Sequence, residues 1–239
     1  MEIESGIRAE PTEDRAQRLG VTSATSGVSK VSSNSFRRRR FGMFLAMLEQ
    51  VAAERPGQAI RVVDIGGVKG YWEGVADLWG HLPLDITIVN IGADPSRDGP
   101  YRIEGGDACA LPYPDNSFDI VHSNSVIEHV GGWSHMAAMA REVARIAPRY
   151  FVQTPSFWFP LEPHYRTLFF HWWPETVRAR MLMRKKRGFR TKKATMHEAM
   201  EDVQSVVLLS AAQLKALFPS ARIEREKILG LTKSIIAVR

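Results

Sequence analysis

Short apolar runs alternate with segments of helical periodicity through the middle of the chain. The helical segments span residues 71–82 and 133–147. Strands that are separated by helices pair in parallel, through right-handed crossovers. The pattern therefore predicts an α/β fold with a largely parallel sheet. Four apolar runs are predicted as buried strands: residues 60–65, 85–91, 118–123 and 149–153.

The two ends of this alternation differ from its middle. Residues 36–54 have helical spacing, and Pro56 and Gly57 then end the predicted helix. Residues 210–218 predict a second helix with Ser210 as its N-cap. Two strands follow, joined around Gly230, and they predict an antiparallel edge on the sheet.

Two segments fit neither period. Residues 1–35 are rich in Ser, Thr, Glu, Arg and Gly, which predicts a disordered leader before a domain over 36–239. Residues 154–200 combine aromatics and prolines with a run from Arg178 to Lys193 that holds nine basic residues and no acidic one. We predict an aromatic and basic lid, inserted over the carboxyl edge of the sheet. Its aromatics either stack on a flat or sugar ligand or seal an apolar lid, and its cations either bind phosphate or form a solvated helix face.

Composition narrows the class of protein. The chain has 239 residues, a formal charge of +6, 44% hydrophobic and 24% charged residues, which fits an ordinary globular protein and excludes a fibrous one. The single cysteine, Cys109, excludes an intramolecular disulfide and a cysteine-based zinc site, and we predict no metal site. There is no apolar signal segment and no apolar run of membrane-spanning length, so we expect a cytoplasmic protein.

The first candidate for chemistry is a glycine-rich turn after the first strand. Residues 62–70 read VVDIGGVKG, in which the strand runs into glycines before a helix. Such turns lie at the carboxyl ends of parallel strands, where ligands bind. The segment lacks the GKS/T of a P-loop and the G-x-G-x-x-G of a dinucleotide site. Alone it predicts only a ligand-binding or a structural turn.

A second block lies at residues 106–119, GDACALPYPDNSFD, and leads into IVHSNSVIEHV. Together the two blocks resemble the class I S-adenosylmethionine-dependent methyltransferases of the type 11 group. The family pattern D-x-G-x-G-x-G aligns with Asp64, Gly66, Val68 and Gly70, and the resemblance runs over residues 61–153. It implies a Rossmann-like, doubly wound, seven-stranded, mostly parallel sheet with an antiparallel C-terminal strand. It also implies methyl transfer with S-adenosyl-L-methionine as cofactor.

The resemblance implies a set of cofactor-binding residues. The Asp64 carboxylate suits the methionine ammonium, and Asp107 suits the adenine amine. The alternative for both is a structural role as a turn cap. Two residues depart from the family pattern: Val68 replaces the middle glycine, and Asn90 replaces the carboxylate that binds the ribose hydroxyls. An amide lacks charge assistance, so weaker binding is expected. The predicted cofactor-binding residues are Asp64, Gly66, Gly67, Asn90, Asp107, Ala108, Ser123 and Asn124.

An oxygen acceptor would gain from a general base, although the sulfonium needs little acid–base help. The predicted catalytic residues are His164, Glu128 and His129, and Glu162 and His171 are further candidates. The alternative for each is a packed or surface residue without a catalytic role, and for Glu128 it is stabilisation of a helix N-terminus.

The predicted function is methyl transfer from S-adenosyl-L-methionine to a small-molecule or glycan-type acceptor, by O- or N-methylation. A catalytically silent methyltransferase-fold binding module is the alternative, as is a basic membrane or nucleic-acid adaptor. Nucleic acid is not the expected partner. Trp172 and Trp173 beside many cations allow peripheral contact with an anionic membrane. The sequence leaves the oligomeric state open.

Overall fold

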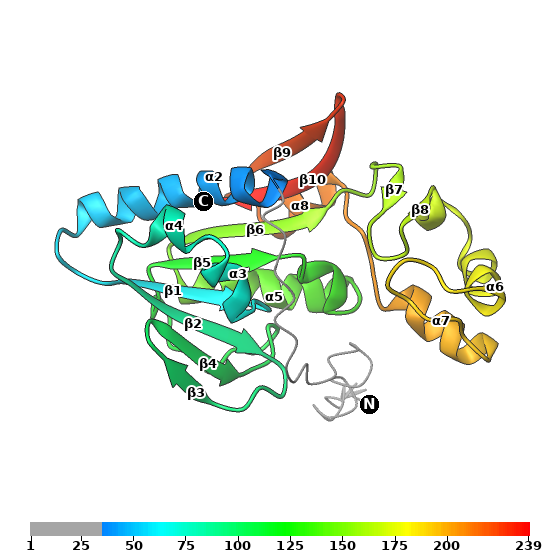
Figure 1. Cartoon of the computed structure of the whole chain (residues 1–239), viewed down its shortest axis with the longest axis horizontal. Coiled ribbons are helices and arrows are strands. Elements are labelled where there is room, and N and C mark those ends of the chain that lie inside the picture. Colours follow the sequence, from blue (N-terminus) through cyan, green and yellow to red (C-terminus); the bar gives the residue numbers. More distant parts are fainter. Residues whose placement is uncertain (1–34) are drawn as a thin grey trace, which may run out of the picture.

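The computed structural model describes residues 35–239, so the predicted leader lies, except for Ser35, outside the described residues. An eight-stranded sheet forms the centre of the fold (Figure 1). In spatial order its strands are β3 (Ser96–Asp98), β4 (Tyr101–Gly105), β2 (Leu84–Asn90), β1 (Ile60–Ile65), β5 (Ile120–Asn124), β6 (Arg149–Pro155), β10 (Leu231–Val238) and β9 (Arg222–Ile228).

The strands from β4 to β6 pair in parallel, and β10 pairs antiparallel with both β6 and β9. The predicted α/β, Rossmann-like fold with antiparallel C-terminal strands is therefore confirmed. The sheet has one strand more than the seven predicted, because the short β3 pairs antiparallel with β4 at the edge. Its three residues are all exposed and give no apolar signal.

Helices cover both faces of the sheet. On one face α2 (Ser35–Glu54), α3 (Lys69–Glu73) and α4 (Ala76–Trp79) pack through Phe41, Phe44 and Trp72. On the other face lie α5 (Trp133–Ile146) and α8 (Ala211–Leu217). Successive strand residues point to opposite faces, so Val62 belongs to the first core and Val63 to the second.

Two of the helices predicted from the sequence can be compared with the structure. The single helix predicted over 71–82 is instead two short helices, α3 and α4, each ending at a glycine, Gly74 and Gly80. At α8 the predicted cap is confirmed, because the Ser210 side chain accepts from the backbone of Gln213, whose side chain bonds back to Ser210.

The segment between β6 and α8 forms an annex beyond the carboxyl ends of the parallel strands (Figure 1). Its elements are β7 (Leu161–Glu162), β8 (Thr167–Leu168), the 3-10 helix η2 (Phe170–Trp172), α6 (Glu175–Arg184) and α7 (Met196–Gln204). It has a small core of its own, made of Tyr165, Phe170, Ala179, Leu182, Ala199 and Val203.

Part of the annex's basic run has a structural partner. The buried Asp202 carboxylate lies 2.6 Å from Lys193 Nζ and 3.5 Å from Arg190 Nε. These two cations neutralise a buried charge rather than facing solvent or a ligand. None of the described helices has the length and apolar character needed to cross a membrane.

Candidate cofactor and acceptor site

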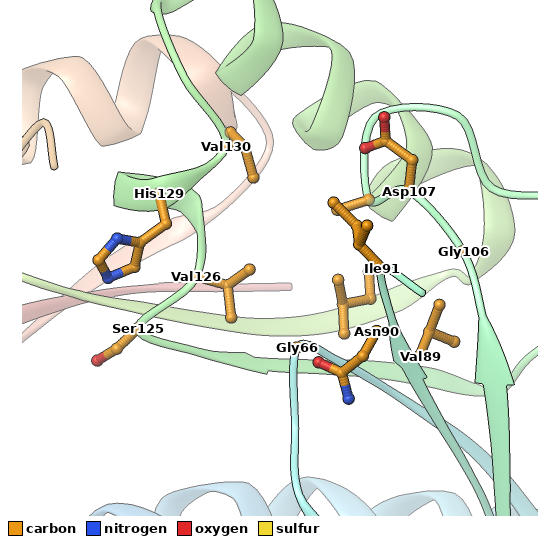
Figure 2. Close-up of a pocket in the computed structure, with 12 residues that line it drawn as sticks. Gly66, Val89, Asn90, Ile91, Gly106, Asp107, Ser125, Val126, His129 and Val130 are labelled. Atoms are coloured by element: carbon orange, nitrogen blue, oxygen red, sulfur yellow. The ribbon is translucent and has the colours of Figure 1, made fainter. Parts of the chain in front are cut away.

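A cavity of about 200 Å³ lies at the carboxyl ends of β1, β2, β4 and β5, and we call it the glycine-loop cavity. Figure 2 shows Asp107 and Ile91 on one side of it and Ser125 and His129 on the other. Its lining comprises Ile65, Gly66, Val89, Asn90, Ile91, Gly106, Asp107, Ala108, Ser125, Val126, His129 and Val130.

Gly66 provides the floor of this cavity as bare backbone. Its φ is +73°, in the left-handed region, and a Cβ there would lie 2.4 Å from Val126 Cγ2. Its amide donates to the Val89 carbonyl oxygen at 2.8 Å, which joins the loop to β2. Glycine is therefore required here both by conformation and by space.

Asp64 is placed differently from the prediction. Its carboxylate is 1% exposed and lies outside the cavity lining. Oδ2 accepts from Trp72 Nε1 and Oδ1 contacts His122 Nδ1, both at 2.7 Å. A Cβ on Gly67 would fall 1.7 Å from Oδ2, so the carboxylate occupies the space beside that glycine. Asp64 thus fixes the loop from beneath, and no direct contact with a cofactor ammonium is available to it in this structure.

The structure has room for both residues that depart from the family pattern, Val68 and Asn90. Val68 is 61% exposed at the N-cap of α3 and does not line the cavity. Asn90 lines it, and its Nδ2 donates to the Gly67 carbonyl oxygen at 2.8 Å, which leaves Oδ1 to accept from a ribose hydroxyl. Asp107 and Ala108 also line the cavity, as predicted for an adenine site, and Asp107 Oδ1 accepts from the Cys109 amide.

The two residues predicted at the end of β5, Ser123 and Asn124, do not line the glycine-loop cavity. Ser123 is fully buried and its hydroxyl donates to the Ile65 carbonyl oxygen, so it lies beneath the cavity rather than lining it. Asn124 lines a neighbouring cleft instead. Ser125, which sequence reasoning missed, has φ +59° and lines both spaces. The signal available was its place directly after the strand, where the chain must turn.

The neighbouring space is a cleft of about 610 Å³, which we call the cationic cleft. Arg37, Arg40, Arg166 and Lys233 line it, together with His164, and no acidic residue of the described chain does so. Arg40 is held by Asn124 Oδ1, Gln153 Oε1 and Glu226 Oε2 at 2.7 to 3.0 Å.

Two of these cations have no acidic partner in the part of the chain that the structure describes. Within the described residues, Arg37 and Arg166 form no ion pair, and their guanidinium groups lie over the rings of Tyr71 and Phe189. The cleft is therefore suited to an anionic ligand.

The three predicted catalytic residues meet at the boundary between the two spaces. His129 lines the glycine-loop cavity and His164 lines the cationic cleft, and their Nε2 atoms are 3.1 Å apart. Glu128, His129 and His164 each present a ligand atom within 4.8 Å of the others, and we call this trio the histidine cluster. The further candidate His171 does not join it, because its Nε2 contacts the Phe157 carbonyl oxygen.

Burial changes the acid–base character of the histidine cluster. Loss of solvation raises the pKa of Glu128 to about 7, although a hydrogen bond from Thr154 opposes this. Burial, with a smaller effect of the neighbouring His164, lowers the pKa of His129 to about 4. His129 is therefore a neutral imidazole near pH 7.

Comparisons with known proteins agree with this architecture. Residues 86–148 match the family model of the methyltransferase domain, type 11. No curated protein matches the chain. The match covers about a quarter of the chain. Together with the sheet topology, it bears out the resemblance to the class I S-adenosylmethionine-dependent methyltransferases that the motifs predict.

Solved structures with low sequence identity are similar to the chain. They include the CMeT domain of the citrinin polyketide synthase, with TM-score 0.49, 11% identity, and coverage of 82% of this chain and 51% of that one. Phosphoethanolamine N-methyltransferase 2 of Haemonchus contortus has TM-score 0.46 and 14% identity, with coverage of 91% and 47%. Magnesium protoporphyrin IX methyltransferase of Synechocystis PCC 6803 has TM-score 0.47 and 13% identity, with coverage of 95% and 94%. The chain thus spans about half the length of the first two.

Proposed function

We propose that the protein transfers the methyl group of S-adenosyl-L-methionine to an oxygen or nitrogen of an anionic small molecule or glycan-type compound. The acceptor binds in the cationic cleft. The observation that carries this proposal is that the cationic cleft and the glycine-loop cavity share Ser125 in their linings. A ligand in one space therefore lies beside a ligand in the other.

The glycine-loop cavity fits the cofactor on its own features. The backbone at Gly66 leaves room that any Cβ would fill. Asn90 Oδ1 is an acceptor for a ribose hydroxyl, and Asp107 and Ala108 offer polar groups beside the apolar walls of Val89 and Ile91. We propose that the cofactor-binding residues are Gly66, Asn90, Asp107, Ala108 and Ser125.

The cofactor supplies a methyl group on a positively charged sulfur, which is already electrophilic. The chain's own contribution is to align the acceptor with that methyl group and to exclude water. Arg37 and Arg166 hold the acceptor's anionic group, and the annex, which lies beyond the carboxyl ends of the parallel strands (Figure 1), supplies part of the wall of the cleft.

Two calorimetric and enzymatic measurements test the proposal. S-adenosylhomocysteine should bind to the full chain with a measurable heat, whereas a silent binding module without a cofactor site would give none. Phosphorylated and carboxylated hydroxy compounds, with their uncharged counterparts, are then offered with S-adenosylmethionine and analysed for a gained methyl group by mass spectrometry. Anionic vesicles carrying glycolipid are included, because Trp158, Leu168 and Trp173 of the annex are exposed.

Charge removal in the cationic cleft sharpens the test. Arg166→Met should raise KM for the acceptor by about 10- to 100-fold, since a hydrogen bond to a charged group contributes roughly 1.5–3 kcal/mol. The affinity for S-adenosylhomocysteine should stay within twofold. Lys192→Met, an exposed cation of the same annex, is the matched control and should change neither value. Methylation of uncharged acceptors alone would contradict the anionic acceptor.

A further inference from the structure

The hydrogen-bond partners of the two histidines in the histidine cluster indicate which ring nitrogens carry hydrogen. His164 Nδ1 lies 2.7 Å from Glu162 Oε1, so this nitrogen donates its hydrogen to the carboxylate. His129 Nδ1 lies 3.3 Å from the Ser205 carbonyl oxygen, which can only accept. In neutral rings the remaining nitrogens, both Nε2, then carry lone pairs. Those two lone pairs face each other across 3.1 Å.

Two facing lone pairs repel unless a cation lies between them. A shared proton and a metal ion both meet this requirement. With metal–nitrogen bonds of roughly 2.0–2.1 Å, two imidazoles on a tetrahedral ion have their nitrogens about 3.3 Å apart. The observed 3.1 Å is close to that spacing.

A carboxylate oxygen in the same place distinguishes the two cations. Glu128 is 0% exposed, and its Oε1 has no hydrogen-bond partner among the described residues. Its Oε2 is fixed by the Thr154 hydroxyl at 2.9 Å. A proton held between the two imidazoles leaves Oε1 without a partner, which is unfavourable for a buried polar group. A metal ion satisfies both nitrogens and this oxygen together.

The surroundings also fit a metal centre. Histidine ligands commonly donate their other nitrogen to a carboxylate or a carbonyl, which fixes the ring and its tautomer. Glu162 has this relation to His164, and the Ser205 carbonyl has it to His129. Glu162 is itself held, because its Oε2 accepts from the Tyr165 amide at 2.6 Å.

We propose that Glu128, His129 and His164 bind one divalent transition-metal ion at the boundary between the glycine-loop cavity and the cationic cleft. Two imidazole nitrogens and one carboxylate oxygen favour Zn²⁺, Fe²⁺, Co²⁺ or Mn²⁺ over Mg²⁺, which prefers oxygen ligands and near-octahedral geometry. Three protein ligands leave coordination positions open. The sequence predicts no metal site, because it holds a single cysteine and because His129 and His164 lie 35 positions apart, on either side of a helix and a strand.

The ion would activate the acceptor in the proposed methyl transfer, and this part of the inference rests on that proposed function. An acceptor hydroxyl bound at an open position loses its proton to water more readily, since metal coordination lowers the pKa of the bound oxygen. That oxygen then forms the bond to the methyl carbon, the carbon–sulfur bond breaks, and its electron pair returns to sulfur to give S-adenosylhomocysteine. His164 then acts as a metal ligand rather than as a general base.

Metal binding is tested without activity. Tag-free full-length protein is stripped with a chelator, dialysed and titrated with Zn²⁺ against a chromogenic chelator, and separately with Co²⁺ by visible absorption. We expect one equivalent of Zn²⁺, Co²⁺ bands typical of nitrogen and oxygen ligands, and no displacement by millimolar Mg²⁺. S-adenosylhomocysteine calorimetry on the same preparation shows that the fold and the cofactor site are intact.

Four variants grade the response. His164→Ala and His129→Ala each remove a ligand and should weaken Zn²⁺ binding at least 100-fold. Glu162→Gln keeps the shape of the outer partner and should weaken it about 10- to 100-fold, as loss of such partners does in other metal sites. His197→Ala removes an exposed histidine outside the cluster and should leave the affinity unchanged.

The outcomes separate this inference from the proposed function. Protein that binds S-adenosylhomocysteine but takes up no stoichiometric Zn²⁺ or Co²⁺ overturns the metal site and favours a shared proton, leaving the proposed function standing. Metal uptake with unchanged affinity in His164→Ala, His129→Ala and Glu162→Gln overturns the metal site as well. Metal binding without any cofactor binding would instead contradict the proposed function. If the alanine variants do not fold, the Co²⁺ spectrum of the wild type and the Glu162→Gln affinity still decide the matter.

Discussion

The glycine-loop cavity and the cationic cleft share Ser125 but are built in different ways. The cavity is lined mostly by apolar side chains and backbone from the ends of four neighbouring parallel strands, β4, β2, β1 and β5, and from the loops that follow them. The cleft takes its cations from α2, from the annex and from β10, and its volume is about three times larger, at 610 Å³ against 200 Å³. One space is a property of the sheet, whereas the other depends on elements added around it.

The difference indicates which part of the site is specific to this chain. A sheet edge with a glycine loop fits the constant part of a reaction, the cofactor, because its geometry follows from the strand–turn–helix connection. Charges from distant segments can change without altering the sheet. If the proposed function holds, we expect acceptor choice to depend on Arg37, Arg166 and Lys233 rather than on the glycine loop.

Gly66→Ala should have the largest effect on the glycine-loop cavity. The substitution places a Cβ 2.4 Å from Val126 Cγ2 at a φ of +73°. Left-handed strain and overpacking together should lower the free energy of unfolding by about 2–4 kcal/mol. Because Val126 must shift into the cavity, S-adenosylhomocysteine affinity should fall more than 100-fold in calorimetry.

Gly70→Ala is the matched control for this glycine. It lies in the same motif, within α3, and a Cβ there meets no atom within 4 Å. Replacing a helical glycine should raise the free energy of unfolding by about 0.5–1 kcal/mol with the affinity unchanged. Equal losses in both variants would show that the loop is sensitive to any added side chain, and the comparison between the two glycines would fail.

Arg40→Met should damage the cationic cleft through stability. Arg40 joins four elements, since its guanidinium binds Asn124 of β5, Gln153 of β6 and Glu226 of β9 from its place on α2. The side chains of Arg40 and Glu226 are only 11% and 7% exposed, so the substitution leaves a buried carboxylate without its cation. The free energy of unfolding in urea should fall by about 3 kcal/mol.

Arg39→Met is the control, because Arg39 is the exposed neighbour on α2. Its free energy of unfolding should change by less than about 0.5 kcal/mol. In folded Arg40→Met protein, S-adenosylhomocysteine affinity should be nearly retained, since Arg40 does not line the glycine-loop cavity. A large loss of affinity at full folding would mean that the two spaces are mechanically coupled.

The features that follow from a contiguous stretch of sequence could be predicted, as the glycine loop shows. The α/β order, the C-terminal strand pair and the placement of Gly66 and Asp107 follow from contiguous patterns, because strand, turn and helix are local. Asp64 occupies the expected position, yet its carboxylate faces Trp72 and His122. The motif fixes where the residue stands along the strand but not which neighbours its side chain meets.

Tertiary placement accounts for the remaining differences. Ser123 and Ser125 are two residues apart, and only the reversal at Ser125, with φ +59°, brings the second into both spaces. The contact between His129 and His164 depends on how the annex packs against residues 128–129, and no periodicity in residues 154–200 predicts it. The sequence indicated His129 and His164 as separate candidates, and only the structure shows that they are in contact.

Asn90→Asp gives the smallest expected effect and tests how finely the glycine-loop cavity is adjusted. A carboxylate restores a charge-assisted bond to the ribose, a gain on the order of 1 kcal/mol over a neutral bond. It also removes the bond from Asn90 Nδ2 to the Gly67 carbonyl oxygen and sets two acceptors against each other there, at a similar cost. The two effects nearly cancel, so S-adenosylhomocysteine affinity should change by less than about fivefold, which is about 1 kcal/mol. Asn90→Ala, which loses both bonds, serves as the reference and should bind more weakly than either. A gain above tenfold in Asn90→Asp would show that the amide contributes nothing to the loop, and that this departure from the family pattern has no structural compensation.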